Sequence, residues 1–445
     1  MRFVRWLYPG IGVKRWLLVF TAGIFLLGVG IAMAIDPTAI LAIETAITKI
    51  ARNRQQVSTI RAGMVLAVAG GALTLISLQA IIRNVYQATV PRGGESLGKL
   101  LFFRRNLERG PRIVAIGGGT GLSVLLRGLK EFTGNLAAVV TVADDGGSSG
   151  RLRQELGILP PGDIRNCLLA LADTEPLMER LFQYRFKEGS GLAGHNFGNL
   201  FIAALTDVTG DFEEAVRQSS KVLAVRGKVL PTTLQNVTLV AELADGRRLR
   251  GETAVSSATS RIKRLRLDPP DPEALPEAIA AIKEADAIVL GPGSLYTSVI
   301  ANLLVPGIAE AIRESQALKI HVLNIMTQPG ETAGYRASDH VRALMDNGGE
   351  GCIDLVVANN QKVPEDAETR YVSQGARQVE VDVQRLKNLG VTIAEEPLAS
   401  WDGGVVRHSP EKLAKYLWRA ILKHRGAAIR QRLIEMYTSP EKAKG

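Results

Sequence analysis

Two long uncharged runs near the N-terminus constrain this chain more than any other feature of its sequence. The first is Trp16–Ile35, which follows a Lys-Arg pair, and the second is Ala62–Ile82, which has arginine on both sides. About twenty helical residues, each rising ~1.5 Å, span the ~30 Å hydrocarbon core of a bilayer. A cleaved signal peptide and buried core helices are the alternatives, but no small-residue cleavage site followed by polar sequence ends the first run. The pattern predicts a transmembrane helical hairpin with helices at about 16–35 and 62–82.

The distribution of charge supports this hairpin and argues against nucleic-acid binding. Residues 1–109 hold fourteen Lys and Arg against four Asp and Glu, whereas the remaining residues hold forty of each, so the net charge of +10 belongs to the N-terminal module. A nucleic-acid-binding domain normally carries clustered positive charge on its working surface. We therefore expect no nucleic-acid partner for the C-terminal part.

The same charges predict how the hairpin is oriented. Ten basic residues flank the two runs on the outside and four lie between them, which favours both ends in the cytoplasm. We expect residues 1–110 to form a cell-membrane hairpin and a linker (83–110), with a soluble domain facing the cytoplasm. The connecting stretch Thr38–Ile50 is predicted to lie along the membrane interface.

From Arg112 onward, short β-branched runs alternate with helical patterns, which predicts an α/β fold with a doubly wound, mostly parallel, Rossmann-like sheet. A DG turn between two short runs predicts a small β insertion at about 237–267. Residues 410–445 are predicted to form a basic helical tail. Two cysteines, Cys167 and Cys352, exclude a disulfide framework and a cysteine-rich zinc site. The buried strands are predicted at Ile113–Ile116, Ala138–Val142, Ala287–Leu290, Ile320–Leu323 and Leu355–Val357.

In such a sheet, ligands bind beyond the carboxyl ends of the strands. The first strand is followed by a GGGTG run, in which the glycines allow backbone N–H groups to approach an anion and the next helix adds a positive N-terminus. The spacing matches neither a dinucleotide fingerprint nor a Walker A loop, because a leucine replaces the third glycine and no lysine follows. A tight turn without ligand is the alternative. The candidate residues are Gly117, Gly118, Gly119, Thr120 and Gly121.

The second strand is followed by two adjacent carboxylates, Asp144 and Asp145, and then by Ser148 and Ser149. A carboxylate at this place commonly holds a ribose hydroxyl, and two together could hold Mg²⁺ shared with a substrate phosphate. An Asx turn is the alternative. The serine loop is predicted to wrap an anion.

Two helix starts follow. Asp163 is predicted to cap the first, whose first turn carries Arg165 and Asn166. The second carries His195 and Asn199, which at a spacing of four residues share a helix face. His195 is as consistent with a structural role as with ligand binding. Zinc is not expected, because no second His or Cys lies nearby.

Two further loops follow predicted strands at the same edge of the sheet. Gly291, Gly293 and Ser294 form a second predicted anion cradle, followed by a helix. Asn324 and Thr327 offer both donors and acceptors, which suits a base, sugar or amide. Five such loops on one edge predict a phosphate-bearing ligand, most simply a nucleotide.

At these residues the sequence resembles the CofD-like superfamily, and most closely its bacterial branch, called YvcK-like or the gluconeogenesis factor family. The matching runs include AIGGGTGLSVLLRGLK, VTVADDGGSSGRLR, PPGDIRN, GHNFGN, GPGSLYTS and NIMTQPGET, over about residues 111–409. The resemblance implies a protein that binds UDP-N-acetylglucosamine and supports cell shape and envelope synthesis during gluconeogenic growth. It also implies nucleotide-sugar contacts at Tyr371 and Arg407. The archaeal relatives are 2-phospho-L-lactate transferases that use Mg²⁺.

Three hypotheses remain open. The first is a regulatory binder of UDP-N-acetylglucosamine at the membrane, with an envelope-synthesis protein as partner and a homo-oligomer as an option. The second is a transferase in which Asp144 and Asp145 hold Mg²⁺. The third is a membrane scaffold with a vestigial nucleotide fold. No catalytic nucleophile or general base can be named from the sequence.

Overall fold

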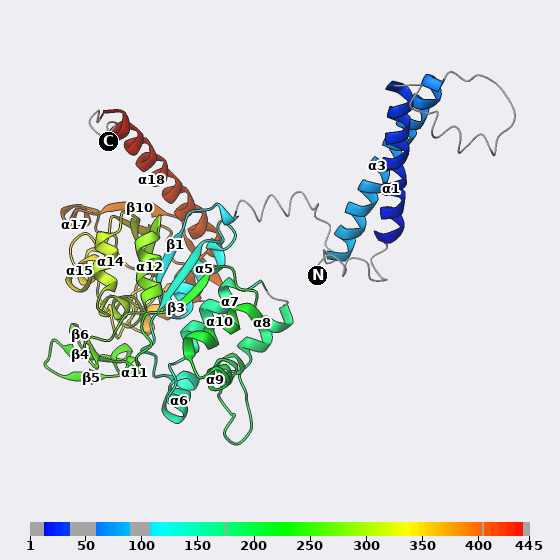
Figure 1. Cartoon of the computed structure of the whole chain (residues 1–445). Helices are drawn as coiled ribbons and strands as arrows, with labels where there is room; N and C mark the ends of the chain where they lie inside the picture. Colours follow the sequence, from blue (N-terminus) through cyan, green and yellow to red (C-terminus); the bar gives the residue numbers. More distant parts are fainter. Residues whose placement is uncertain (1–12, 36–58, 90–106, 174–175, 403–404, 439–445) are drawn as a thin grey trace, which may run out of the picture. The chain divides into compact units, whose positions relative to one another are not determined.

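The structure is a computed structural model, and it describes residues 13–35, 59–89, 107–173, 176–402 and 405–438 (Figure 1). The chain divides into two compact units, residues 1–103 and 104–445, and each is described by itself. The predicted interfacial stretch Thr38–Ile50 and residues 90–106 of the predicted linker lie outside the described residues.

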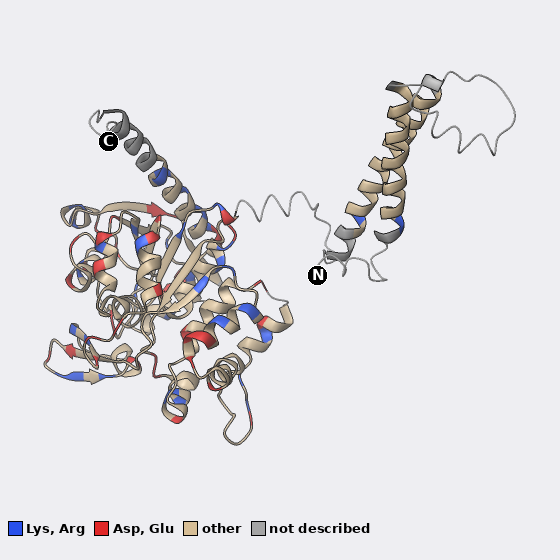
Figure 2. Ribbon diagram, in the orientation of Figure 1, with Lys and Arg blue, Asp and Glu red and all other residues tan. Residues whose placement is uncertain are grey.

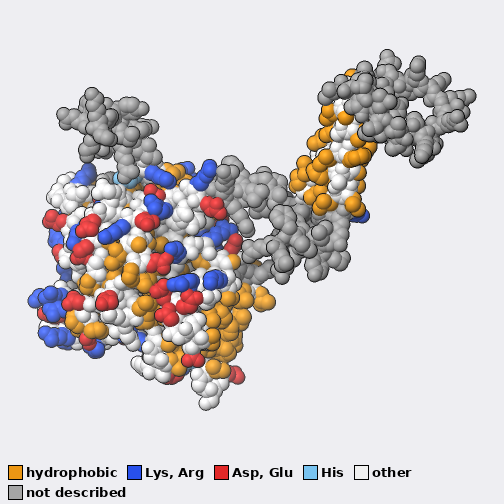
Figure 3. Space-filling model, in the orientation of Figure 1, with side chains coloured by type: hydrophobic (Ala, Val, Ile, Leu, Met, Phe, Trp, Pro, Cys, Tyr) orange, Lys and Arg blue, Asp and Glu red, His pale blue; other side chains and the backbone are white. Residues whose placement is uncertain are grey.

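The first unit contains two helices, α1 (Val13–Ile35) and α3 (Thr59–Thr89), and both predicted apolar helices are therefore confirmed. Each is long and apolar enough to cross a membrane, over Arg15–Ala34 and Ala62–Asn84. Figure 2 shows long stretches of both helices without a charged residue, and Figure 3 shows apolar side chains covering their surface. Helices that expose apolar side chains all round are typical of lipid-facing segments.

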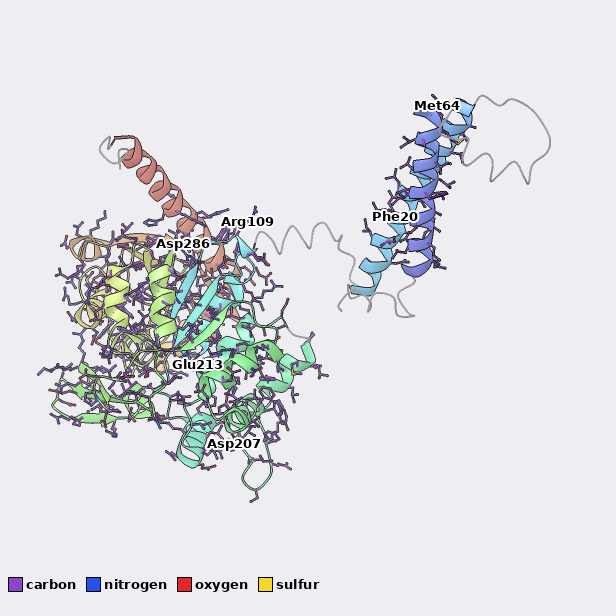
Figure 4. All side chains as sticks on the ribbon, in the orientation of Figure 1. Phe20, Met64, Arg109, Asp207, Glu213 and Asp286 are labelled. Carbon is purple, nitrogen blue, oxygen red and sulfur yellow. The ribbon has the colours of Figure 1, made fainter. Side chains whose placement is uncertain are left out.

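Glycines set the distance between α1 and α3. A Cβ added to Gly30 would lie 2.3 Å from the backbone nitrogen of Ala67, and one added to Gly70 would lie 2.4 Å from that of Leu27. As residue numbers increase along α1, the residue numbers of its contacts on α3 decrease, so the two helices pack antiparallel. Small residues permit such close packing where no hydrophobic effect drives helices together. Large apolar side chains such as Met64, which is 57% exposed, cover the outside (Figure 4).

The second unit is built on a seven-stranded parallel sheet with the order β10-β9-β8-β7-β1-β2-β3. Its central strands are buried β-branched and alanine-rich runs, as expected for a sheet covered on both faces. The doubly wound α/β prediction is confirmed. The strands are β1 (Ile113–Gly117), β2 (Leu136–Val140), β3 (Lys228–Pro231), β7 (Ala287–Leu290), β8 (Leu318–Val322), β9 (Leu355–Asn359) and β10 (Thr392–Glu396).

The strand order reverses between β1 and β7. The chain runs from β1 to β2 and β3 on one side, and from β7 to β8, β9 and β10 on the other. A crevice forms at such a reversal, because the connections leave in opposite directions. The helices that frame it are α5 (Gly119–Leu129), α6 (Gly147–Leu156), α7 (Gly162–Leu171), α9 (Phe197–Thr209), the π-helical η2 (Leu295–Ile300) and α16 (Glu365–Ser373). Further helices are α8 (Pro176–Gln183), α10 (Phe212–Val222), α12 (Pro276–Glu284), α13 (Ala301–Leu303), α14 (Ile308–Glu314), α15 (Ala337–Gly348) and α17 (Val383–Asn388).

The small β insertion is a separate antiparallel sheet with the order β5-β4-β6. Its strands are β4 (Thr238–Leu243), β5 (Arg248–Arg250) and β6 (Ile262–Asp268), and the DG turn joins β4 to β5 with Gly246 at φ +85°. The short helix α11 (Glu252–Ser256) follows β5. Figure 1 shows this sheet standing apart from the seven-stranded sheet, below α12, with α11 beside it.

The C-terminal part adds the hairpin β11 (Ala399–Asp402) and β12 (Val405–His408), followed by α18 (Pro410–Thr438). The first turns of α18 pack on α5 through buried Leu413, Leu417 and Ile421. Gly128 of α5 allows this contact, because a Cβ there would lie 2.2 Å from the Pro410 carbonyl oxygen.

Candidate functional site

The glycine run after β1 leaves the start of α5 open. Gly118 is extended, Gly119 has φ +63°, and no side chain caps the helix. The backbone approaches its neighbours closely: a Cβ on Gly118 would lie 2.4 Å from Asp163 Oδ2, and one on Gly121 would lie 2.5 Å from the Pro292 carbonyl oxygen. Apart from the Gly119 N–H, which donates to Asp163, the first N–H groups of α5 and the helix dipole are therefore available to an anion.

This helix start opens on a cavity of about 440 Å³ at the carboxyl ends of β1, β7 and β8. Ten of the twenty predicted site residues line it, which places the first, fourth and fifth strand-end loops on one cavity together with two residues from the C-terminal part. They are Gly118, Gly119, Thr120, Gly121, Gly293, Ser294, Asn324, Thr327, Tyr371 and Arg407. Gly117 and Gly291 lie directly behind them, because Gly117 ends β1 and the Gly291 N–H donates to Ile116.

The other predicted residues gather beside the cavity, not in its lining. Ser148, Ser149, Arg165, Asn166, His195 and Asn199 lie at or next to the starts of α6, α7 and α9. Ser148 Oγ lies 3.2 Å from His195 Nδ1, and Asn199 Nδ2 donates to Ser149 Oγ over 3.4 Å. Arg165 donates to Asn199 and Asn166 over 2.9 and 2.7 Å. His195 is thus held in a polar network, and a contact of its ring with ligand stays a prediction.

The two adjacent aspartates make separate hydrogen bonds. Asp144 Oδ1 accepts from the Gly146 N–H over 2.8 Å, which is the Asx turn that the sequence left open. Asp145 Oδ1 accepts from the backbone and hydroxyl of Thr253, on α11. Among the described residues, no group of three or more His, Cys, Asp and Glu is placed to hold a metal ion. A Mg²⁺ site at Asp144 and Asp145 therefore stays a prediction.

Asp163 does not cap its helix, contrary to the prediction. α7 begins at Gly162 after Pro161, and the Asp163 carboxylate lies against the glycine run, where it accepts from the Gly119 N–H. Burial, and then the nearby charge of Asp144, raise the pKa of Asp163 to about 7. Sequence reasoning missed it, because an Asp after Pro-Pro-Gly is most simply a cap.

A second carboxyl group at the cavity, Glu252 of α11, had no sequence signal. It comes from the β insertion, and its Oε2 is buried without a hydrogen-bond partner. Burial raises the pKa of Glu252 to about 9, and Asp144 and Asp163 add to the shift. Glu252 is therefore a neutral carboxylic acid at pH 7, which does not repel an anionic ligand.

At the predicted second anion-binding site, the N–H groups at the helix start already bind a side chain of the protein, Glu331. Glu331 accepts from the N–H groups of Tyr296 and Thr297 over 2.8 and 3.3 Å, at the start of η2, and from the Thr297 hydroxyl over 2.8 Å. A carboxylate at a helix start is stabilised by the same groups that would hold a phosphate. Gly293 and Ser294 remain in the cavity lining.

The far end of the cavity is apolar and aromatic. Tyr371 of α16 is half-buried against Ile325, Met326 and Val406, and its hydroxyl accepts from the Val406 N–H over 3.1 Å. This contact joins α16 to β12. Arg407, next on β12, is exposed at the cavity. Both positions come from elements more than 240 residues after the glycine run, so the cavity is completed by the C-terminal part of the chain.

His408 lines the same end and was missed by sequence reasoning. Its ring is 7% exposed and donates to the Leu323 carbonyl, while Nε2 has no partner. Burial lowers the pKa of His408 to about 4, so the ring is neutral at pH 7. Because the nitrogen that faces Leu323 must carry the proton, Nε2 is an acceptor for a ligand N–H or O–H.

Comparisons with known proteins agree with this architecture. The family model described as "2-phospho-L-lactate transferase CofD" matches residues 113–399. A "Gluconeogenesis factor" from Bacillus subtilis is 51% identical over 307 residues, covering 69% of this chain and 97% of that protein. A "Putative gluconeogenesis factor" from Nostoc sp. is 49% identical over 419 residues, covering 94% of this chain and 92% of that protein. The latter similarity extends into the N-terminal unit.

A solved structure shows the same fold. The crystal structure of a member of the UPF0052 family from Bacillus halodurans superimposes with a TM-score of 0.67 at 50% sequence identity. It covers 68% of this chain and 98% of that chain. The α/β part therefore exists as a free-standing protein in a relative.

Proposed function

This chain belongs to the CofD family, on the branch of the gluconeogenesis factors, and on that premise we propose that it is a regulatory protein that binds UDP-N-acetylglucosamine. It would couple the supply of this nucleotide sugar to envelope synthesis and cell shape during gluconeogenic growth. The observation that carries the proposal is the single cavity of about 440 Å³ that joins an uncapped helix start to an apolar, aromatic end.

The two ends of the cavity suit the two halves of such a ligand. The amides at Gly118 to Gly121 suit a pyrophosphate, because a helix start offers free donors and a positive dipole. Arg407 can add charge-assisted hydrogen bonds to the same phosphates. The Tyr371 ring supports stacking by a base or sugar face.

Buried polar atoms at the cavity favour a ligand that offers hydrogen bonds of its own. Buried polar atoms without partners are rare in folded proteins, and three of those in the described chain, Glu252 Oε2, Gln328 Oε1 and His408 Nε2, belong to residues that line this cavity. A sugar hydroxyl, which can donate or accept, would satisfy any of them, and an acetamido or base N–H would satisfy those that accept.

We further propose that the hairpin of α1 and α3 spans the cell membrane with both ends, and the soluble domain, in the cytoplasm. Their apolar surface and the excess of basic residues outside the two runs support this topology. Membrane attachment would bring the sensor to the place where envelope precursors are assembled and where a protein partner would read it.

Calorimetry of the full chain in detergent with UDP-N-acetylglucosamine, UDP and GDP tests the binding proposal. We expect saturable binding of UDP-N-acetylglucosamine, weaker binding of UDP and GDP, and no change in the ligand after incubation. Absence of binding by all three ligands would contradict the proposal.

A transferase of the 2-phospho-L-lactate type is the second candidate. The observation in its favour is the pair of carboxyl groups with raised pKa, Asp163 and Glu252, beside the open start of α5. Such groups are often found where a proton or a metal-bound phosphate is handled. Consumption of a nucleotide-linked substrate that requires Mg²⁺ would favour it over the sensor.

A further inference from the structure

The three-stranded sheet carries a basic solvent face. Along β4, Leu239, Ala241 and Leu243 are buried, while the alternate residues face outward. The same alternation in the neighbouring strands buries Leu265 and Leu267 and leaves their arginines exposed. We call this surface the arginine face and define it by Arg248 and Arg250 of β5 and Arg264 and Arg266 of β6.

The strand register arranges these side chains in two rows. Arg248 and Arg264 are the cross-strand partners of Glu242, one on each side. In the next row, Arg250 and Arg266 flank Val240 in the same way. Figure 2 shows blue ribbon segments along these strands, and Figure 3 shows blue side chains gathered at the same corner of the domain.

Most of this charge has no partner within the domain. Arg250 pairs with Asp268, and Lys263, at the β-bulge of β6, lies 3.9 Å from Glu242. No ion pair is recorded for the other three arginines of the face within the part of the chain that the structure describes. Beside β6, a cavity of about 420 Å³ has a lining of mixed charge, with Lys263, Arg264 and Arg266 on one hand and Asp271 and Asp346 on the other.

The face is suited to a flat anionic surface. Residues 110–445 carry equal numbers of basic and acidic side chains, so this concentration of arginines is local. The strands contain no aromatic residue on which nucleic-acid bases could stack. The same chain carries two helices able to span a membrane, which would keep the domain close to lipid headgroups and compensate for weak individual contacts.

We propose that the arginine face docks on the anionic lipid headgroups of the membrane that holds the hairpin. This inference rests on the proposed membrane insertion of α1 and α3. Arginine binds phosphate bidentately, and basic side chains near an anionic bilayer are attracted within a Debye length. Docking would fix how the domain, and the cavity next to α11, faces the membrane.

Energy transfer in nanodiscs tests the docking on the full chain. Both native cysteines, Cys167 and Cys352, are buried, so a dye can be placed on Ala244→Cys at the end of β4, with Asn388→Cys on α17 as a reference position. The acceptor dye is on the lipid headgroups. We expect transfer from position 244 to be stronger in discs with phosphatidylglycerol than in discs of phosphatidylcholine alone, and to be lost at high salt.

Matched variants distinguish an effect of the arginine face from an effect of the total charge of the protein. Replacing Arg248, Arg250, Arg264 and Arg266 by Gln should abolish the lipid dependence at position 244. Replacing four other exposed basic residues, Arg342, Lys362, Arg385 and Lys387, by Gln removes the same charge and should leave it intact. Equal transfer in both lipids, or equal loss in the two variants, would overturn the proposal.

Failure of the hairpin to insert into the membrane can be distinguished from failure of the arginine face to dock. A chain that does not enter the discs contradicts the proposed membrane insertion, but it leaves the arginine face open to a direct test. Co-sedimentation of the same chain and variants with vesicles containing phosphatidylglycerol then decides, because binding that is lost in the arginine-face variant and kept in the matched control belongs to the face and not to the basic N-terminal module. No co-sedimentation would overturn the inference.

Discussion

At the scale of single residues, the cavity is lined by groups whose replacement should change ligand binding or stability measurably. Gly118 has no room for a side chain, Arg407 is the exposed cation at the cavity, and Glu252 and His408 present buried atoms without partners. Each of these properties leads to a different measurement.

Arg407→Ala should weaken binding of UDP-N-acetylglucosamine by about 1.5–3 kcal/mol, because it removes charge-assisted hydrogen bonds to phosphate. Calorimetry measures the change. Arg385→Ala, an exposed arginine on α17, is the control and should bind as the parent does. Unchanged affinity in Arg407→Ala would remove this residue from the site.

Gly118→Ala should abolish ligand binding and lower stability by about 1–3 kcal/mol, because its Cβ would lie 2.4 Å from Asp163 Oδ2 and 2.9 Å from Thr141 Cγ2. Gly426→Ala on α18 adds a methyl group with no atom within 4 Å and serves as the control. Thermal unfolding with and without ligand gives both quantities. A Gly118→Ala protein that binds normally would show that α5 does not hold the phosphates.

Ligand affinity should fall as the pH rises from 7 to 10. The raised pKa values of Asp163, about 7, and Glu252, about 9, mean that both carboxyl groups lose their protons over this range and then repel the pyrophosphate. An effective dielectric near 20 makes this worth about 1–2 kcal/mol. In Glu252→Gln the decline near pH 9 should disappear. The same ligand is used with both proteins, so any ligand titration cancels, and identical profiles would refute the assignment.

At the scale of elements, loops from distant parts of the chain meet because parallel strands end at the same edge. The glycine run, the Gly293-Ser294 loop and the Asn324–Thr327 loop could be grouped from the sequence, since each follows a buried strand. α11 and the β11-β12 hairpin could not. Their contributions, Glu252 and His408, depend on how an insertion and a C-terminal hairpin pack over that edge.

The packing of α1 on α3 should depend on the glycines at their contact and not on glycine in general. Gly30→Val places methyl groups where the Ala67 backbone lies 2.3 Å from the Cβ position, whereas Gly28 has no atom within 4 Å. In a Leu27→Cys, Gly71→Cys background, disulfide formation reports the contact of the two helices. We expect Gly30→Val to suppress it and Gly28→Val to leave it unchanged, and the opposite pattern would refute the antiparallel packing.

At the scale of the whole molecule, three buried histidines link stability to pH. Burial lowers the pKa of His321 to about 3 and that of His408 to about 4, and it also lowers the pKa of His340. In the unfolded chain these rings take up protons near pH 6.5, whereas the folded protein resists doing so. The histidine contribution to the free energy of unfolding is therefore complete above pH 6.5 and falls as the pH drops toward 4, whereas the raised pKa values of Asp163 and Glu252 contribute in the opposite direction.

Thermal unfolding between pH 7 and 4.5 measures this linkage. Each histidine that titrates only on unfolding costs about 1.4 kcal/mol per pH unit. His321→Asn keeps a donor for the Leu290 carbonyl and should change the slope of stability against pH by one such histidine contribution relative to the parent, with His424→Gln on the partly exposed side of α18 as the control. Equal slopes in all three proteins would contradict the assignment.

The sequence by itself determined the apolar helices, the α/β sheet and the glycine run, because each depends on local composition: uncharged length, buried β-branched strands, and residues without a side chain. The edge strands β3 and β10 were not predicted, since β3 ends in proline and β10 is partly polar. Tertiary structure alone decided which loops share the cavity. It places Asp163 at the cavity and not at a helix cap, places Glu331 at the start of η2, and leaves His408 Nε2 without a partner. These positions could not be predicted because they depend on residues far apart in the chain and on the cost of burying charge.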